Sequence, residues 1–132
     1  MIELKLLEKN KEEILNIIED IRQKTDSGIP IIVEGAKDIE SLELLGIKHN
    51  IITLRNKKLY EVGEEVEGKD EVIILTDFDR TGTRYAYDLN NRLLNRGLNA
   101  NLHYWKRLKF FLKKWIKDIE SMGNFLKKKL MI

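Results

Sequence analysis

The segment that most constrains the fold is residues 71–82, with the sequence EVIILTDFDRTG. Its apolar residues 72–75 form a short continuous run, which predicts a strand buried on both faces of a parallel sheet. Asp77 and Asp79 follow with one residue between them, so an extended backbone points both carboxylates to the same side. Gly82 then precedes a helical pattern. A strand that ends in paired acids beside a helix N-terminus is where an α/β sheet places a ligand site.

Two interpretations of these paired acids have to be weighed. Carboxylates are hard oxygen ligands and a helix N-terminus attracts phosphate, so the pattern indicates Mg²⁺ together with a phosphate. Asp-x-Asp is also ordinary turn sequence, because aspartate caps helices and tolerates tight loops. A third acid elsewhere in the chain therefore favours the metal site over the turn.

A second strand–acid–turn unit lies earlier in the chain. Residues 29–33 (IPIIV) predict a short strand, followed by Glu34 and Gly35 and then by a helix over residues 37–45. Asp38 lies in the first turn of this helix, where the helix dipole favours a negative charge. Two such units in one small domain indicate a common role.

The two units are expected to meet at one edge of the sheet. Right-handed crossovers place the carboxyl ends of parallel strands at the same edge, so Glu34, Asp77 and Asp79 are expected to converge. Three crowded carboxylates repel one another, and a divalent cation offsets that repulsion. The chain has no cysteine and only two histidines, which argues against a thiolate or histidine metal centre.

The remaining pattern completes a single α/β domain with about four strands, a mainly parallel sheet and helices on both faces. The other predicted elements are an N-terminal helix over 3–25, strands over 50–54 and 99–104, a short helix or crossover over 59–66, and a helix over 83–96. The predicted parts are an N-terminal helix within 1–28, a core over 29–104 and a basic helical segment over 105–132.

The C-terminal segment is expected to be one helix with a loose end. The helix starts near residue 105, carries apolar side chains on one face and lysines on another, and breaks at residues 121–123. Its aromatic residues are interpreted as packing residues and not as base-stacking platforms. The pentapeptide Lys-Asp-Ile-Glu-Ser occurs at 37–41 and again at 117–121, which we interpret as a shared helix-start sequence.

Charge divides the chain into an acidic body and a basic end. Residues 1–102 carry 15 Lys/Arg and 20 Asp/Glu, a net charge of −5. Residues 103–132 carry 9 Lys/Arg and two acids, a net charge of +7. The basic end predicts a polyanionic partner, with a solvated lysine face in a thermophile-like composition as the alternative. The chain shows no long apolar run and no leader pattern, so a cytoplasmic protein without membrane contact is expected.

The two acidic motifs resemble those of the Toprim domain family. Residues 34–38 (Glu-Gly-Ala-Lys-Asp) resemble its E-G-x-x-D motif, and residues 77–82 (Asp-Phe-Asp-Arg-Thr-Gly) resemble its D-x-D-x-x-G motif. The motifs stand in the family's order, each closes a predicted strand, and the resemblance spans residues 29–104. In size the chain is similar to small stand-alone Toprim proteins, which are related to DnaG-type primases, OLD-family nucleases and the ribonuclease that matures small ribosomal RNA.

The resemblance implies an Mg²⁺-dependent protein that acts on RNA or DNA by phosphodiester cleavage or by nucleotidyl or phosphoryl transfer. It implies one or two Mg²⁺ ions, with Mn²⁺ as a substitute, held by Glu34, Asp77 and Asp79. It also implies a general acid/base role for Glu34. The structural residues of the motifs would be Gly35, Asp38 and Gly82, and the basic side chains expected to contact phosphate are Arg55, Lys57, Lys58, Arg80, Arg84, Lys106, Lys109 and Lys113.

Other interpretations of the same residues stay open. A non-catalytic module that binds metal and nucleic acid within a larger processing complex would retain the same three acids. Residues 77–81 also resemble the D-x-D-x-T motif of haloacid dehalogenase-type phosphatases, in which the first acid is a nucleophile. That fold begins with its motif and gives Glu34 no role. We expect neither a topoisomerase nor a complete primase, because both rely on further segments.

Overall fold

The apolar runs form one four-stranded, all-parallel sheet. The computed structural model describes residues 2–132, with side chains from residue 5 onward. The strands are β1 (Ile31–Val33), β2 (Ile51–Thr53), β3 (Val72–Ile74) and β4 (Ala100–Asn101), in the spatial order β2-β1-β3-β4. This sheet confirms the predicted α/β class and its four parallel strands.

The two central strands, β1 and β3, form the middle of the core. All of their side chains are β-branched and fully buried, which suits a strand covered by helices on both faces. The strands pair in parallel with Ile31 opposite Ile73 and Ile32 opposite Ile74. This register aligns their carboxyl ends, so the segments that follow them begin side by side.

The N-terminal segment contains two helices where the apolar periodicity predicts one. Helix α1 (Ile2–Lys9) and helix α2 (Lys11–Asp26) meet at Asn10, whose φ of −95° and ψ of 5° lie outside the helical region. Asparagine is a poor helix former, because its side chain competes for local backbone hydrogen bonds. The single helix predicted over residues 3–25 is therefore wrong at this position.

The C-terminal segment is also two helices, and the predicted break is in the wrong place. Helix α6 spans His103–Leu112 and helix α7 spans Ile119–Leu130. Helix α7 runs through residues 121–123, where the sequence predicted a break and a loose end. Asp118 Oδ1 accepts a hydrogen bond from the Ser121 N–H at 2.8 Å and so caps the new helix.

Gly123 is a packing residue and not a helix breaker. Helix α7 packs against helix α3 (Ala36–Leu44), and a Cβ on residue 123 would lie 2.4 Å from the Ser41 carbonyl oxygen. The Gly123 N–H also donates to Ser41 Oγ at 2.7 Å. The missing side chain lets the two helices approach closely, so the C-terminal segment belongs to the folded body.

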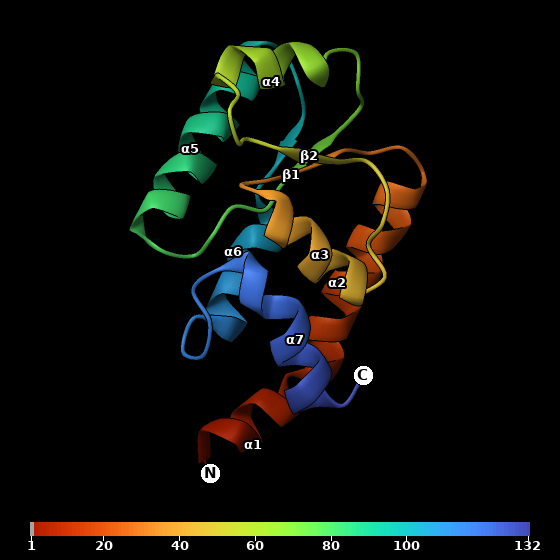
Figure 1. Cartoon of the computed structure of the whole chain (residues 1–132), viewed down its shortest axis with the longest axis vertical. Helices are drawn as coiled ribbons and strands as arrows, with labels where there is room; N and C mark the ends of the chain where they lie inside the picture. Colours follow the sequence, from red (N-terminus) through yellow and green to blue (C-terminus); the bar gives the residue numbers. More distant parts are fainter. Residues whose placement is uncertain (1) are drawn as a thin grey trace.

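The crossover helices cover both faces of the sheet. Helix α3 connects β1 to β2, whereas α4 (Leu59–Glu65) and α5 (Arg80–Asn95) connect strands that follow one another in the opposite direction across the sheet. Right-handed crossovers therefore place α3 on one face of the sheet and both α4 and α5 on the other. Figure 1 shows α4 and α5 together on one side of the strands, and α2, α3 and α7 on the other. The predicted helices over 37–45 and 83–96 are confirmed to within a few residues. None of the helices within residues 2–132 combines the length and apolar composition of a bilayer span.

Candidate functional site

The first acids of the two motifs meet where β1 and β3 end. Glu34 follows β1 directly, and Asp77 lies shortly after β3 on the neighbouring parallel strand. Glu34 Oε2 accepts a hydrogen bond from the Asp77 N–H at 2.8 Å. The sheet register alone accounts for this contact, because it places the two strand ends side by side. Residues separated by more than 40 positions thus share one site.

The N-terminus of α7 is attached to the same loop, which the sequence did not predict. Asp77 Oδ1 accepts a hydrogen bond from the Ile119 N–H at 2.8 Å, and the Phe78 N–H donates to the Lys117 carbonyl oxygen at 2.7 Å. An N–H group at a helix start favours a negative charge on its partner. The available signal was the pentapeptide at 117–121, whose repeat of 37–41 marks a second helix start.

Gly82 fits tightly under the loop that carries the acids. A Cβ on this residue would lie 2.1 Å from the Asp77 carbonyl oxygen, so only glycine leaves room for that backbone. Thr76 Oγ1 donates to the Gly82 carbonyl oxygen at 2.6 Å and holds the first turn of α5 against the strand end. The D-x-D-x-x-G spacing therefore has a steric reason in this fold.

The other two structural residues of the motifs act at the start of α3. The Asp38 carboxylate accepts a hydrogen bond from the Gly35 N–H at 3.0 Å, which caps the helix. Gly35 itself has an extended φ of −152°, and a Cβ added to it would meet no other atom within 4 Å. Asp38 thus shapes the turn after Glu34, whereas the space around Gly35 does not require a glycine.

Burial and like charge raise the pKa of two acids at the site. Desolvation of the half-buried Asp77 carboxylate is the main cause that raises its pKa to about 7. Repulsion from the neighbouring carboxylates adds to this, the neighbours being Glu34, Asp38 and Asp79. Burial also raises the pKa of Asp38, with Glu34 as a further source of repulsion. A cation among these groups would relieve the repulsion.

Asp79 makes the helix-cap contact that the turn interpretation of the sequence allowed. Its Oδ1 accepts a hydrogen bond from the Gly82 N–H at 2.7 Å, and its exposed side chain is the N-cap of α5. Within the described residues, no three acidic or histidine side chains are arranged as a ready metal cluster. The structure brings Glu34 and Asp77 into contact and places the Asp79 carboxylate at the N-terminus of α5, where its charge still adds to the repulsion on Asp77. The shared metal site of the three acids stays a prediction.

The donor set nevertheless fits a hard divalent cation. Glu34, Asp77 and Asp79 each use one carboxylate oxygen for a backbone N–H and each have a second oxygen. Oxygen ligands of this kind suit Mg²⁺ or Mn²⁺.

A pocket of about 390 Å³ lies beside Glu34. The loop after β2 forms one wall with Arg55, Asn56 and Lys57, and Tyr85 of α5 contributes to the lining. Arg55 is exposed, whereas Lys57 Nζ lies 3.0 Å from Glu65 Oε1, so part of its charge is already neutralised. The pocket therefore combines an acid with basic groups at its rim.

The other predicted phosphate contacts surround the site less closely. Lys109 Nζ donates to Thr83 Oγ1 at 3.1 Å, and this hydroxyl donates to the Asp79 carbonyl oxygen at 2.7 Å, so Lys109 reaches the motif loop. Within residues 5–132, no described hydrogen bond or ion pair joins the remaining basic groups to the three acids. These exposed groups are Lys58, Arg80, Arg84, Lys106 and Lys113.

Replacing Asp77 by asparagine is expected to stabilise the metal-free protein at pH 8. The folded pKa of about 7 lies above the ordinary aspartate value of 3.8, so the wild type loses stability as pH rises from about 4 to about 7. The amide oxygen still accepts from the Ile119 N–H. After discounting for the partly exposed side chain, the gain is about 1–2 kcal/mol at pH 8 and disappears near pH 4.

Urea unfolding in EDTA at the two pH values measures this difference. Asp88→Asn, which neutralises an exposed acid on α5, is the matched control and should give no such pH-dependent gain. Added Mg²⁺ should raise the melting temperature of the wild type more than that of Asp77→Asn. Equal stabilities of Asp77→Asn and wild type at pH 8 would contradict the electrostatic interpretation.

Comparison with known proteins agrees with the motifs and the fold. The family model described as Toprim domain matches residues 29–110. A UPF0292 protein of Methanocaldococcus jannaschii is 35% identical over 121 residues, covering 90% of this chain and 94% of that protein. A UPF0292 protein of Methanosarcina barkeri is 33% identical over 129 residues, covering 97% of this chain and 90% of that protein. A solved structure of a protein from Aquifex aeolicus has a TM-score of 0.69 at 30% identity, covering 80% and 94% of the two chains.

The family match includes both acidic motifs and ends within α6, a little beyond the predicted limit at residue 104. In the structure Glu34 contacts Asp77, whereas the haloacid dehalogenase interpretation gave Glu34 no role. Toprim domains are metal-binding, nucleic-acid-related modules, and the names of these relatives specify no reaction. The chain belongs to the Toprim domain family and is a relative of the archaeal UPF0292 proteins.

Proposed function

We propose that this protein is a divalent-metal-dependent enzyme that acts on phosphodiesters of RNA or DNA, by cleavage or by nucleotidyl transfer. The observation that carries the proposal is the hydrogen bond from the Asp77 N–H to Glu34 at 2.8 Å. It places the acid of the first motif beside the acids of the second, although the two motifs lie on different strands. The family match supports the same assignment.

In this proposal Glu34, Asp77 and Asp79 hold Mg²⁺ or Mn²⁺. The carboxylate donors suit these cations. Burial is the main cause that raises the pKa of Asp77, and the repulsion from neighbouring carboxylates that adds to it is what a cation would relieve. When bound, the cation supplies charge stabilisation for the phosphate oxygens. One or two ions are compatible with three carboxylates.

Glu34 is the proposed general base. Glu34 lines the pocket to which Arg55 and Asn56 also contribute. A phosphate in this pocket would therefore have the Glu34 carboxylate as a proton acceptor and the Arg55 guanidinium group as a positive charge. A carboxylate in this position can accept the proton of the water or hydroxyl group that attacks phosphorus. Arg55 suits the phosphate itself, because a guanidinium group donates two parallel hydrogen bonds to phosphate oxygens.

A non-catalytic metal- and nucleic-acid-binding module is the second candidate. The specific observation that favours it is the contact between Asp79 and the Gly82 N–H, which gives one of the three acids a structural task. Such a module would serve a larger processing complex and would keep affinity for nucleic acid without turning it over.

A turnover assay with labelled RNA and DNA oligonucleotides separates these candidates. The assay compares Mg²⁺, Mn²⁺ and EDTA for the wild type and for the double variant Glu34→Gln, Asp79→Asn. If the wild type forms product only with metal and the double variant forms none, the result supports the catalytic hypothesis. The length of the product then distinguishes cleavage from nucleotide addition. Binding without product supports the module. Equal turnover by the double variant would remove the catalytic assignment, and absence of any binding at low salt would remove both.

A further inference from the structure

Helix α6 displays an exposed aromatic ring among cations. The Phe110 side chain is 74% exposed, the opposite of the packing role that the sequence suggested for the aromatic residues of this segment. Residues three and four positions away are its neighbours on a helix surface. Lys106 and Arg107 occupy such positions on α6, and Lys113 and Lys114 follow directly after the last residue of this helix. The exposed Phe110 ring, whose aromatic neighbour is the Phe111 ring at 5.3 Å, therefore lies among positive charges.

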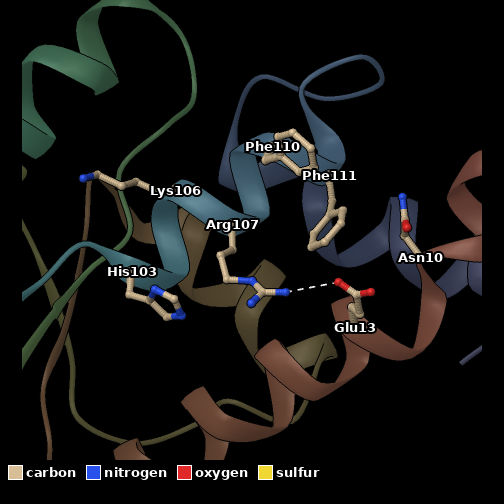
Figure 2. Close-up of a pocket in the computed structure, with 7 residues that line it drawn as sticks. All are labelled: Asn10, Glu13, His103, Lys106, Arg107, Phe110 and Phe111. Atoms are coloured by element: carbon tan, nitrogen blue, oxygen red, sulfur yellow. Dashed lines mark hydrogen bonds and ion pairs between the residues drawn. The ribbon is translucent and has the colours of Figure 1, made fainter.

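Phe110 lies at a hollow of about 620 Å³ between α6 and the start of α2. Figure 2 shows Phe110 and Phe111 on α6, with Asn10 and Glu13 on the opposite side. Arg107 bridges the two sides through an ion pair with Glu13 at 3.1 Å. This pair neutralises the acid in the lining, so the positive charge of Lys106 remains in excess there.

The basic surface around Phe110 continues to the acidic site. Lys109, the residue before Phe110, donates to Thr83 Oγ1, and that hydroxyl donates to the Asp79 carbonyl oxygen. Lys106 lies one helical turn away from Phe110, with its Nζ 5.9 Å from the centre of the Tyr87 ring on α5. A chain of phosphates could therefore run from the motif loop along α6 to Phe110.

We propose that Phe110 is a stacking platform for a base of a single-stranded polynucleotide whose phosphates lie along Lys106, Lys109 and Lys113. The choice of a polynucleotide rests on the proposed function. The stacking platform adds that the bound polynucleotide is single-stranded. Single strands present an aromatic base beside every anionic phosphate, which matches an aromatic ring among cations. A duplex hides the faces of its bases and would leave Phe110 uncovered.

The test is fluorescence-anisotropy binding of labelled single strands of roughly 12 nucleotides in EDTA, so that no turnover occurs. Phe110→Ala is expected to weaken binding about 5- to 150-fold, the range that corresponds to the stacking of one base. Phe110→Trp should bind at least as tightly as the wild type. An abasic strand with the same number of phosphates should bind the wild type and Phe110→Ala equally, and parallel RNA and DNA arms show which sugar is preferred.

Two control variants separate stacking from other effects. Leu94→Ala removes a side chain of α5 that is 52% exposed, and it should leave binding unchanged. Lys113→Gln should weaken binding of base-bearing and abasic strands alike and should reduce the salt dependence. Circular dichroism should be unchanged in all variants, because every substituted side chain is exposed.

Equal binding of base-bearing strands by wild type and Phe110→Ala would overturn the platform even if the enzyme cleaves them. Loss of a concentration-dependent dimer in Phe110→Ala, with strand binding unchanged, would also overturn it and would assign this face to self-association. Phe110-dependent binding without any turnover would support the platform while removing the proposed catalysis. The two hypotheses therefore fail in different measurements.

Discussion

Replacing Gly82 by alanine is expected to lower the free energy of unfolding by about 3 kcal/mol or more. The added Cβ would lie 2.1 Å from the Asp77 carbonyl oxygen and 2.6 Å from its carbonyl carbon. These are backbone atoms of the loop after β3, so they cannot rotate away as a flexible side chain would. Relief requires movement of the motif loop or of the first turn of α5, either of which separates Thr76 from the Gly82 carbonyl oxygen.

Denaturant and thermal unfolding followed by circular dichroism measure this loss. For a domain of this size, 3 kcal/mol corresponds to a fall in melting temperature of roughly 10 °C. Gly35→Ala is the matched control, because Gly35 belongs to the other motif but has an extended φ and open space around it. It should cost less than about 1 kcal/mol. A similar loss in both variants would contradict the contact with the Asp77 backbone as the cause, because Gly35 has no such neighbour.

Replacing Glu34 by glutamine is expected to lower the rate of phosphodiester turnover about 10²- to 10⁴-fold. Glutamine keeps a side-chain oxygen that can accept from the Asp77 N–H, so the loop geometry should survive. It cannot take up a proton as the carboxylate does, and it contributes no charge to a cation. The loss should therefore appear in kcat, with additional weakening of metal binding.

Single-turnover assays at saturating Mg²⁺ and a separate titration of metal binding divide these two contributions. Glu43→Gln, which neutralises an exposed acid on α3, is the matched control and should retain full activity. Restoration of wild-type rates in Glu34→Gln at high Mg²⁺ would limit Glu34 to a ligand role. Wild-type rates at every Mg²⁺ concentration would exclude Glu34 from the chemistry.

Local patterns predicted most of the sheet and the place of its acids. The runs before Glu34 and Asp77 consist of adjacent β-branched residues, and burial on both faces of a parallel sheet is the environment that such runs fit. Once both runs are strands of one parallel sheet, their carboxyl ends fall at one edge. The proximity of these two acids therefore followed from the sequence and the rules of chain crossover.

The partners of the acids depended on tertiary structure. The prediction that Asp77 and Asp79 point to the same side rested on the side-chain alternation of extended backbone. The chain enters α5 directly after Asp79, and the Asp79 carboxylate caps that helix. The Asp77 carboxylate meets the N-terminus of α7, an element more than 40 residues away whose start was misplaced. No local pattern specifies such a contact, since it depends on how the last helix docks.

The C-terminal half of the molecule shows the same division. Gly123 was interpreted as a break because glycine weakens an isolated helix, whereas contact with Ser41 makes the absent side chain favourable. Trp105 and Phe110 both lie on α6, and both were interpreted from the sequence as packing residues. In the structure Trp105 is buried against Thr76, whereas Phe110 faces solvent. Composition and periodicity determined that these residues lie on helices. The packing of those helices on the sheet decided which side chains close the core and which stay available to a ligand, because burial depends on neighbours far away in the sequence.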